Sequence, residues 1–181
     1  MVVLAGVPLV SGLLRRAPPV PAVLGSLPPF ELTEPNGSHL NRSTLEGRIW
    51  VLGFVETDCI ACAERVGGVL EVLQYRLRNA GPAVGMLEVA VTAANPVVDL
   101  PRDQLRRHPN PRQWHLGTGP DSRRLLAEVG ALAPLRGAML EAGTALALVD
   151  GQGRIRAIEG VEAPGALDRL VSKLTLILNI H

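Results

Sequence analysis

The chain has 181 residues, of which 47% are hydrophobic and 19% charged, a balance typical of one globular domain with room for a substantial core. Its formal net charge of +1 argues against a strongly basic, nucleic-acid-binding surface, so we expect no nucleic-acid partner. Two cysteines are too few for a disulfide-rich secreted scaffold, but they suffice for one redox pair or half of a tetrahedral metal site.

The amino-terminal segment is apolar without matching a standard targeting signal. Residues 1–14 are followed by Arg15 and Arg16, whereas a secretory signal places its positive charge before the apolar run. The run is also shorter than the ~20 residues that a membrane-spanning helix needs. Two interpretations stay open: a remnant of an export signal or anchor, and an apolar leader that is flexible or packed. We expect membrane association only through this leader.

A proline-rich segment, residues 17–29, follows the leader. Such a composition is typical of an extended linker with little regular structure. We therefore predict a leader and linker over residues 1–29 and one folded domain over residues 30–181.

The first half of this domain contains strand patterns and one long helical pattern. Residues 30–41 predict a short strand, a turn at Asn36-Gly37 and a return. Residues 48–56 form a continuous apolar run, typical of a buried parallel strand. Over residues 61–79, apolar residues recur every three or four positions and predict a helix that ends at Gly81-Pro82.

The second half of the domain alternates strands and helices. The predicted elements are a buried strand at 84–92, a short helix near Pro101, a helix at 121–129 capped by Asp121 or Ser122, a hairpin of strands 144–149 and 154–158, and an amphipathic helix within 163–180. This order predicts an α/β fold in which a central mixed β-sheet carries helices on both faces.

The two cysteines lie where the strand at 48–56 gives way to a helix. At a helix N-terminus, the free N–H groups and the helix dipole favour thiolate over thiol, which predicts Cys59 as the reactive sulfur. Cys62 follows one turn later, close enough to form a reducible disulfide. In thiol–disulfide exchange, Cys59 would attack a partner's disulfide and Cys62 would resolve the mixed intermediate. The carboxylates of Glu56 and Asp58 oppose ionisation of Cys59, so we expect a moderate thiol.

The residues leave three interpretations of this pair: a redox couple, a metal clip or two structural thiols. The position of the pair at a strand-to-helix junction favours the redox couple. We do not expect a zinc site, because the chain has no second cysteine pair and its histidines show no ligand spacing. The histidines are His39, His108, His115 and His181.

Several segments follow one another in an order that suggests a family. Phe54 and Thr57 precede Cys59 in an F-x-x-T-x-C pattern. The other pieces are "FELTEPNGSHLNRSTLEGRIWVLGF", "VTAANPVVDLPRDQL" with Pro96, Asp99 and Pro101, the step "WHLGTG", and the hairpin "ALALVDGQGRIRAI". Together they resemble the Sco/SenC family of thioredoxin-fold proteins, which assemble the copper centre of cytochrome c oxidase. The resemblance spans about residues 30–160 and implies a thioredoxin-like fold and a place in the cell envelope.

The chain departs from this family at the copper ligands. Members that carry copper have three residues between the cysteines and a histidine just before the late strand, whereas this chain has two residues between them and no histidine over 142–144. The thiolates of Cys59 and Cys62 could still hold Cu(I), a soft ion. His115 and Met139 are the nearest candidates in the pattern for a third copper ligand. His115 is better explained as a surface histidine, and Met139 as a core methionine. The chain also lacks the thioredoxin cis-proline, having Gly143-Thr144 in its place.

Three hypotheses for the function follow from the residues and the resemblance. The first is thiol–disulfide exchange by Cys59 and Cys62 on cysteines of a client protein, in respiratory-oxidase or cytochrome maturation. The second is delivery of Cu(I) held by the two thiolates, and the third is a non-catalytic interaction module. The sequence fixes neither the oligomeric state nor the client, and exchange itself requires no cofactor.

Overall fold

The computed structural model describes residues 18–91, 110, 112–133 and 142–180. Within them the strands are β1 (Gly25–Ser26), β2 (Glu31–Thr33), β3 (His39–Asn41), β4 (Ile49–Glu56), β5 (Val84–Val91), β6 (Trp114–Thr118), β7 (Ala145–Val149) and β8 (Arg154–Gly160). The helices are α1 (Ile60–Arg76), α3 (Ser122–Ala131) and α4 (Ala166–Leu178), with two short 3-10 turns, η1 (Ser43–Leu45) and η2 (Arg78–Ala83).

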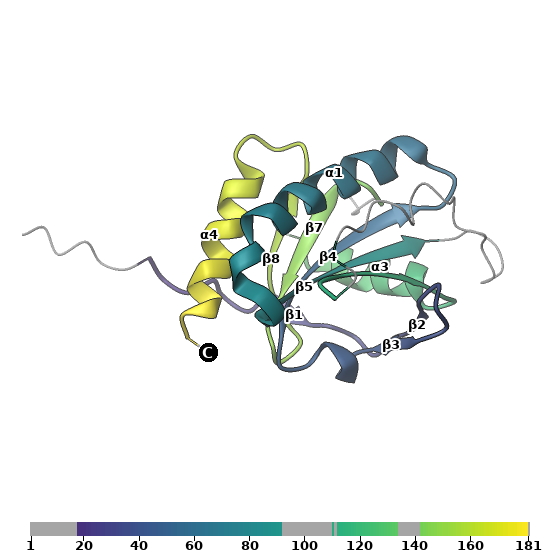
Figure 1. Cartoon of the computed structure of the whole chain (residues 1–181), viewed down its shortest axis with the longest axis horizontal. Coiled ribbons are helices and arrows are strands. Elements are labelled where there is room, and N and C mark those ends of the chain that lie inside the picture. The colour runs from purple at the N-terminus through teal and green to yellow at the C-terminus, as the bar shows by residue number, and fades with distance from the viewer. Residues whose placement is uncertain (1–17, 92–109, 111, 134–141, 181) are drawn as a thin grey trace, which may run out of the picture.

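The strands form one mixed sheet in the order β1-β8-β7-β4-β5-β6-β2-β3 (Figure 1). The central strands β4, β5 and β6 are parallel, whereas β7 and β8 continue the sheet antiparallel on one side. On the other side, the β2–β3 hairpin joins β6. The predicted mixed sheet is therefore confirmed.

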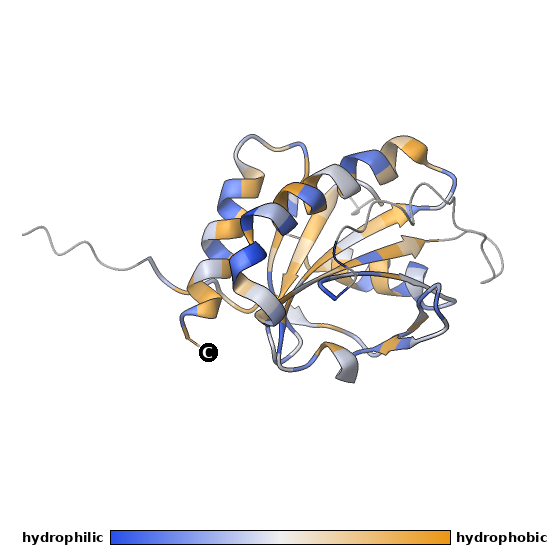
Figure 2. Ribbon diagram, viewed as in Figure 1, coloured by the Kyte–Doolittle hydropathy of each residue, from blue (hydrophilic) through white to orange (hydrophobic). Residues whose placement is uncertain are grey.

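The two central strands are the most deeply buried part of the sheet. Every residue of β5 is buried, and every residue of β4 except Glu56. Strands that are covered on both faces lose the alternation of polar and apolar residues, which explains why the sequences of these two strands are mostly apolar. Figure 2 shows the same strands as the apolar centre of the molecule.

Helices cover both faces of the sheet, as predicted. On one face, Val66 and Leu70 of α1 and Leu170 of α4 pack in a cluster with residues of β4 and β5. On the other face, Leu125 of α3 packs in a second cluster that contains Trp50. Both tryptophans, Trp50 and Trp114, are buried in these clusters.

Most predicted elements are present, and the structure differs from the prediction in three respects. β6 was not predicted, because its five residues include Gly117, are followed closely by Gly119 and contain only a short apolar run. α1 ends at Arg76, and residues 78–83 form η2 rather than the last turn of the predicted helix. Asp121 occupies the N-cap of α3, but its carboxylate accepts the backbone N–H of Glu31 at 2.9 Å instead of capping the helix. The predicted helix near Pro101 lies outside the described residues.

Part of the proline-rich segment lies on the sheet. Gly25 and Ser26 pair with β8, and the side chain of Leu27 is fully buried. Farther back, the Pro21 carbonyl accepts a hydrogen bond from Nε of Arg156 at 2.9 Å. Among the described residues, none of the helices is long and apolar enough to cross a membrane.

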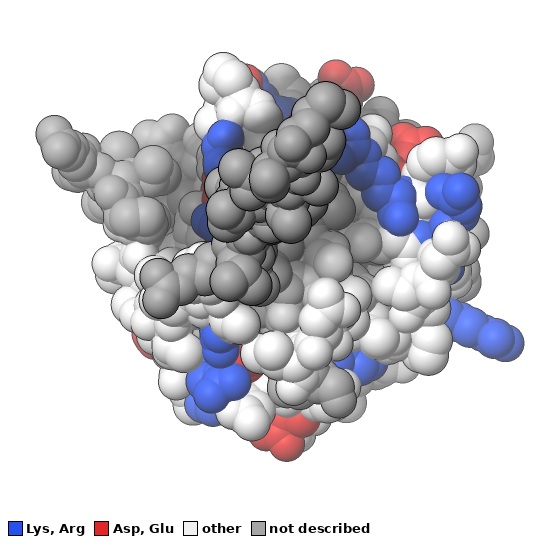
Figure 3. All heavy atoms as spheres, turned by 90° about the vertical axis from the view of Figure 1, so that its left-hand side faces the viewer, with Lys and Arg blue, Asp and Glu red and all other residues white. Residues whose placement is uncertain are grey.

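Charged side chains are spread over the surface. Figure 3 shows basic and acidic residues of one face scattered among uncharged ones. Several are joined in ion pairs, such as Arg76 with Asp168 at 2.6 Å between α1 and α4.

Candidate functional site: the Cys59–Cys62 disulfide

The site is built where the chain leaves the carboxyl end of β4. The N–H of Thr57 bonds to the Val91 carbonyl at 3.1 Å, which ties this exit to the end of the parallel strand β5. The N–H of Cys59 then bonds to the Glu56 carbonyl at 3.1 Å, which closes a turn, and α1 begins at Ile60. In sheets with parallel central strands, functional groups gather at this edge because helices start there.

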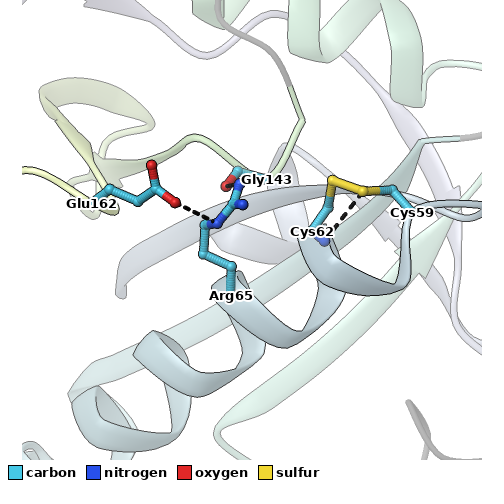
Figure 4. The surroundings of a disulfide bond; sticks show 5 residues. All are labelled: Cys59, Cys62, Arg65, Gly143 and Glu162. Atoms are coloured by element: carbon cyan, nitrogen blue, oxygen red, sulfur yellow. Dashed lines mark hydrogen bonds and ion pairs between the residues drawn. A yellow bond between two sulfur atoms is a disulfide. The ribbon is translucent and has the colours of Figure 1, made fainter.

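The two cysteines are joined in a disulfide. Their Cα atoms lie 5.2 Å apart. Cys59 is the N-cap of α1, and its sulfur accepts the backbone N–H of Cys62 at 3.2 Å (Figure 4). When the bond is reduced, the same N–H and the dipole of α1 stabilise negative charge on Cys59. The structure thus brings together the two residues that the sequence selected.

The disulfide is open to a large partner. Both cysteines are half-buried, and the two residues between them, Ile60 and Ala61, are exposed. Ile60 is 70% exposed, which is unusual for a large apolar side chain.

A short loop before β7 lies against the second cysteine. Gly143 has a φ of +83°, and a Cβ placed on it would lie 2.6 Å from Cβ and 3.1 Å from Sγ of Cys62. Its N–H bonds to the Phe54 carbonyl at 2.6 Å, so the loop is attached to β4. The position thus requires glycine for two reasons, its positive φ and its close approach to Cys62. The described residues contain no cis peptide bond.

Two charged residues complete the surroundings and were not predicted from the sequence. Nη1 of Arg65 donates to the Gly143 carbonyl at 3.3 Å, and its Nε pairs with Oε1 of Glu162 at 2.9 Å (Figure 4). Arg65 follows Cys62 by three residues on α1, so the two side chains share one helix face. That spacing could have drawn attention to Arg65. No sequence signal points to Glu162.

The described residues do not form a copper site of three ligands. They contain no group of three or more His, Cys, Asp or Glu side chains that could hold a metal ion. Beside Cys62, where a third ligand would be needed, Ala142 and Gly143 carry no donor side chain. Two sulfurs alone are an incomplete set for the copper centre that the family resemblance implies. Met139 lies outside the described residues.

His115 is not the surface histidine that the sequence predicted. It lies on β6 with its side chain mostly buried, and Nδ1 is 2.9 Å from Oε1 of Glu34. Its ring lies 5.4 Å from that of Trp50, in the cluster on the α3 face. Cys62 packs against the cluster on the α1 face. His115 and the cysteines therefore lie on opposite faces of the sheet.

Comparison with known proteins supports the fold at low sequence identity. No family model matches the chain, and no curated protein matches it in sequence. Among solved structures, it is similar to BsSco, described as a member of the Sco family of cytochrome c oxidase assembly proteins, with 19% identity and a TM-score of 0.66 over 89% of this chain and 97% of that one. The chain has the thioredoxin-like fold of the Sco proteins.

Two further structures extend this likeness. Bradyrhizobium japonicum ScoI with copper bound has 19% identity and a TM-score of 0.56 over 84% of this chain and 100% of that one. A putative protein disulfide isomerase from Bacteroides thetaiotaomicron has 16% identity and a TM-score of 0.57 over 88% and 92%. The Sco/SenC resemblance seen in the sequence is thus confirmed as a likeness of fold.

Proposed function

We propose that this domain performs thiol–disulfide exchange on cysteines of a partner protein. The observation that carries the proposal is the half-exposed disulfide at the N-terminus of α1, with exposed Ile60 between its cysteines. Exposed disulfides are typically the labile, regulatory or catalytic ones, and this one is partly exposed at the edge of the sheet. The fold shared with the Sco proteins and the disulfide isomerase supports the same chemistry.

The exchange follows from the placement of the two sulfurs. In the reduced domain, the Cys59 thiolate attacks one sulfur of a client disulfide, a Cys59–client bond forms, and the electron pair leaves on the other client sulfur. The Cys62 thiolate then attacks Cys59, the intramolecular disulfide forms, and the second client sulfur leaves. The client gains two electrons and two protons, and the domain loses them. The reverse sequence oxidises a client dithiol.

The client that fits best is a protein whose cysteines must be kept in one redox state before they bind metal. This choice of client is supported by the similarity to BsSco, a member of a family of cytochrome c oxidase assembly proteins. We therefore propose a client in respiratory-oxidase or cytochrome maturation. We propose that the chain acts on the thiols of such a client, with Cu(I) held by the thiolates of Cys59 and Cys62 as the alternative.

The proposal is tested by trapping. A client peptide with a single disulfide is mixed with the reduced variants Cys62→Ser and Cys59→Ser, and mixed disulfides are counted by intact-mass spectrometry. Cys62→Ser should accumulate a covalent adduct through Cys59, because no thiol remains to resolve it. Cys59→Ser should form at least ~10-fold less adduct, since its remaining sulfur lacks the N-cap position. Equal adducts in the two variants, or none in either, would refute the proposal and leave copper delivery or an interaction module.

A further inference from the structure

Gly143, just before β7, packs against Cys62. A Cβ on Gly143 would meet three atoms of Cys62, namely Cβ at 2.6 Å, Cα at 3.0 Å and Sγ at 3.1 Å, and these are its three nearest neighbours. The backbone of Gly143 therefore lies directly on Cys62. Cys59, at the N-cap, is on the side of the pair away from this contact (Figure 4).

Arg65 fixes this loop from the helix that carries the cysteines. Its guanidinium makes two contacts at once, with the Gly143 carbonyl at 3.3 Å and with the Glu162 carboxylate at 2.9 Å. Glu162 lies between β8 and α4, so a single side chain joins three segments that are far apart in the sequence. The N–H of Gly143 is bonded to Phe54, and with Arg65 on the carbonyl both polar groups of Gly143 are held inside the domain.

We propose that Arg65 is a positioning residue that keeps the backbone of Gly143 over Cys62 and so directs a partner to Cys59. This selectivity rests on the proposed function for its biological meaning, because it separates the attacking sulfur from the resolving one. It requires the forked shape of arginine, whose Nε and Nη1 point to different acceptors at the same time. A lysine has one compact ammonium group and cannot reproduce both contacts in the same geometry.

The relative reactivity of the two thiols measures the positioning directly. The reduced protein is treated briefly with limiting iodoacetamide, and labelling at Cys59 and Cys62 is quantified on peptides by mass spectrometry. In each reaction the thiolate forms a bond to the methylene carbon, iodide leaves with the electron pair, and the thiol proton passes to buffer. The readout is the ratio of the Cys59 rate to the Cys62 rate, which a uniform loss of stability does not shift.

The chain offers a matched control for Arg65. Arg76 lies on the same helix, is similarly exposed at 42% against 37%, and pairs with Asp168, which is 74% exposed, as Glu162 is. Arg76→Ala thus removes an equivalent ion pair between α1 and the carboxyl-terminal part of the chain without touching Gly143. Thermal unfolding of both variants verifies that each is folded.

The wild-type ratio should favour Cys59. Arg65→Ala should lower it by about three- to tenfold, the range that loss of one hydrogen bond gives, whereas Arg76→Ala should leave it unchanged. Arg65→Lys should restore only part of the ratio. An unchanged or increased ratio in Arg65→Ala, an equal fall in Arg76→Ala, or full restoration by lysine would each overturn the positioning role. Because labelling needs no client, failure of the trapping experiment would refute the proposed function and leave this result standing.

Discussion

Replacement of Gly143 by alanine tests how closely the loop before β7 is packed on the disulfide. The methyl group would lie 2.6 Å from Cβ of Cys62, and the backbone would keep a φ of +83° that residues with a side chain rarely adopt. The left-handed backbone costs roughly 1–2 kcal/mol. Overpacking against Cys62 adds about 1–3 kcal/mol. We expect Gly143→Ala to lower the free energy of unfolding by about 2–5 kcal/mol in total.

Gly37 provides the control for the backbone part of this loss. Its φ is +85°, and a Cβ there would meet nothing within 4 Å. Gly37→Ala should therefore cost only the backbone penalty of roughly 1–2 kcal/mol. Guanidinium unfolding of both variants, followed by the fluorescence of buried Trp50 and Trp114, measures the two losses.

The difference between the two glycines isolates the contact with Cys62. Because the nearest atom is Cβ of Cys62 and not its sulfur, reduction of the disulfide should leave most of the Gly143→Ala loss in place. If Gly143→Ala destabilised the protein no more than Gly37→Ala, the loop would not be pressed on Cys62, and the argument for directed attack at Cys59 would fail.

Three further predictions concern charge and metal. Asp150 is fully buried and pairs with buried Arg156 at 3.0 Å, so Asp150→Ala should lower the free energy of unfolding by about 3–5 kcal/mol. Replacement of the exposed Asp168 by alanine should cost less than ~1 kcal/mol, and guanidinium unfolding measures both losses. Similar losses in the two variants would refute the buried pairing. Burial alone would raise the pKa of Asp150, but hydrogen bonds from Arg154 and Gln152 outweigh it and hold that pKa below its usual range. The stabilisation that the ionised Asp150 carboxylate gives the fold should therefore be complete above the unfolded-state pKa and be lost as pH falls through the lower folded-state pKa. The difference in the free energy of unfolding between wild type and Asp150→Asn should then become smaller below about pH 4. A difference that stays constant to lower pH would contradict this. His115→Ala should leave the Cu(I) affinity of the reduced protein unchanged in a competition titration with a chromophoric chelator, because the ring lies across the sheet from the cysteines, and a tenfold loss would contradict that placement.

The strands and helices with strong patterns could be predicted from the sequence. β4 and β5 are largely apolar because they are covered on both faces. β4 begins one residue later than predicted, and β5 agrees with the prediction over its described residues. The β7–β8 hairpin could be predicted from the turn residues at 150–153, which separate two apolar runs. β6 was not predicted, because a five-residue strand next to turn residues shows too little periodicity to be distinguished from a loop.

Only part of the candidate site could be predicted from the sequence. Cys59 and Cys62 were found because both lie in one local motif at the start of α1. The contacts of Arg65 with Gly143 and Glu162 span 78 and 97 positions of the chain, and no local pattern encodes them. The absence of a histidine over residues 142–144 was visible in the sequence, but its meaning came from the structure, which places Gly143 on Cys62.

The reduction potential of the Cys59–Cys62 couple tests the central claim most directly. The metal-free protein is equilibrated in glutathione buffers, and its free thiols are counted. We predict a midpoint between roughly −120 and −270 mV, where exchange catalysts lie. A midpoint below about −300 mV, typical of structural disulfides, would contradict a role in exchange.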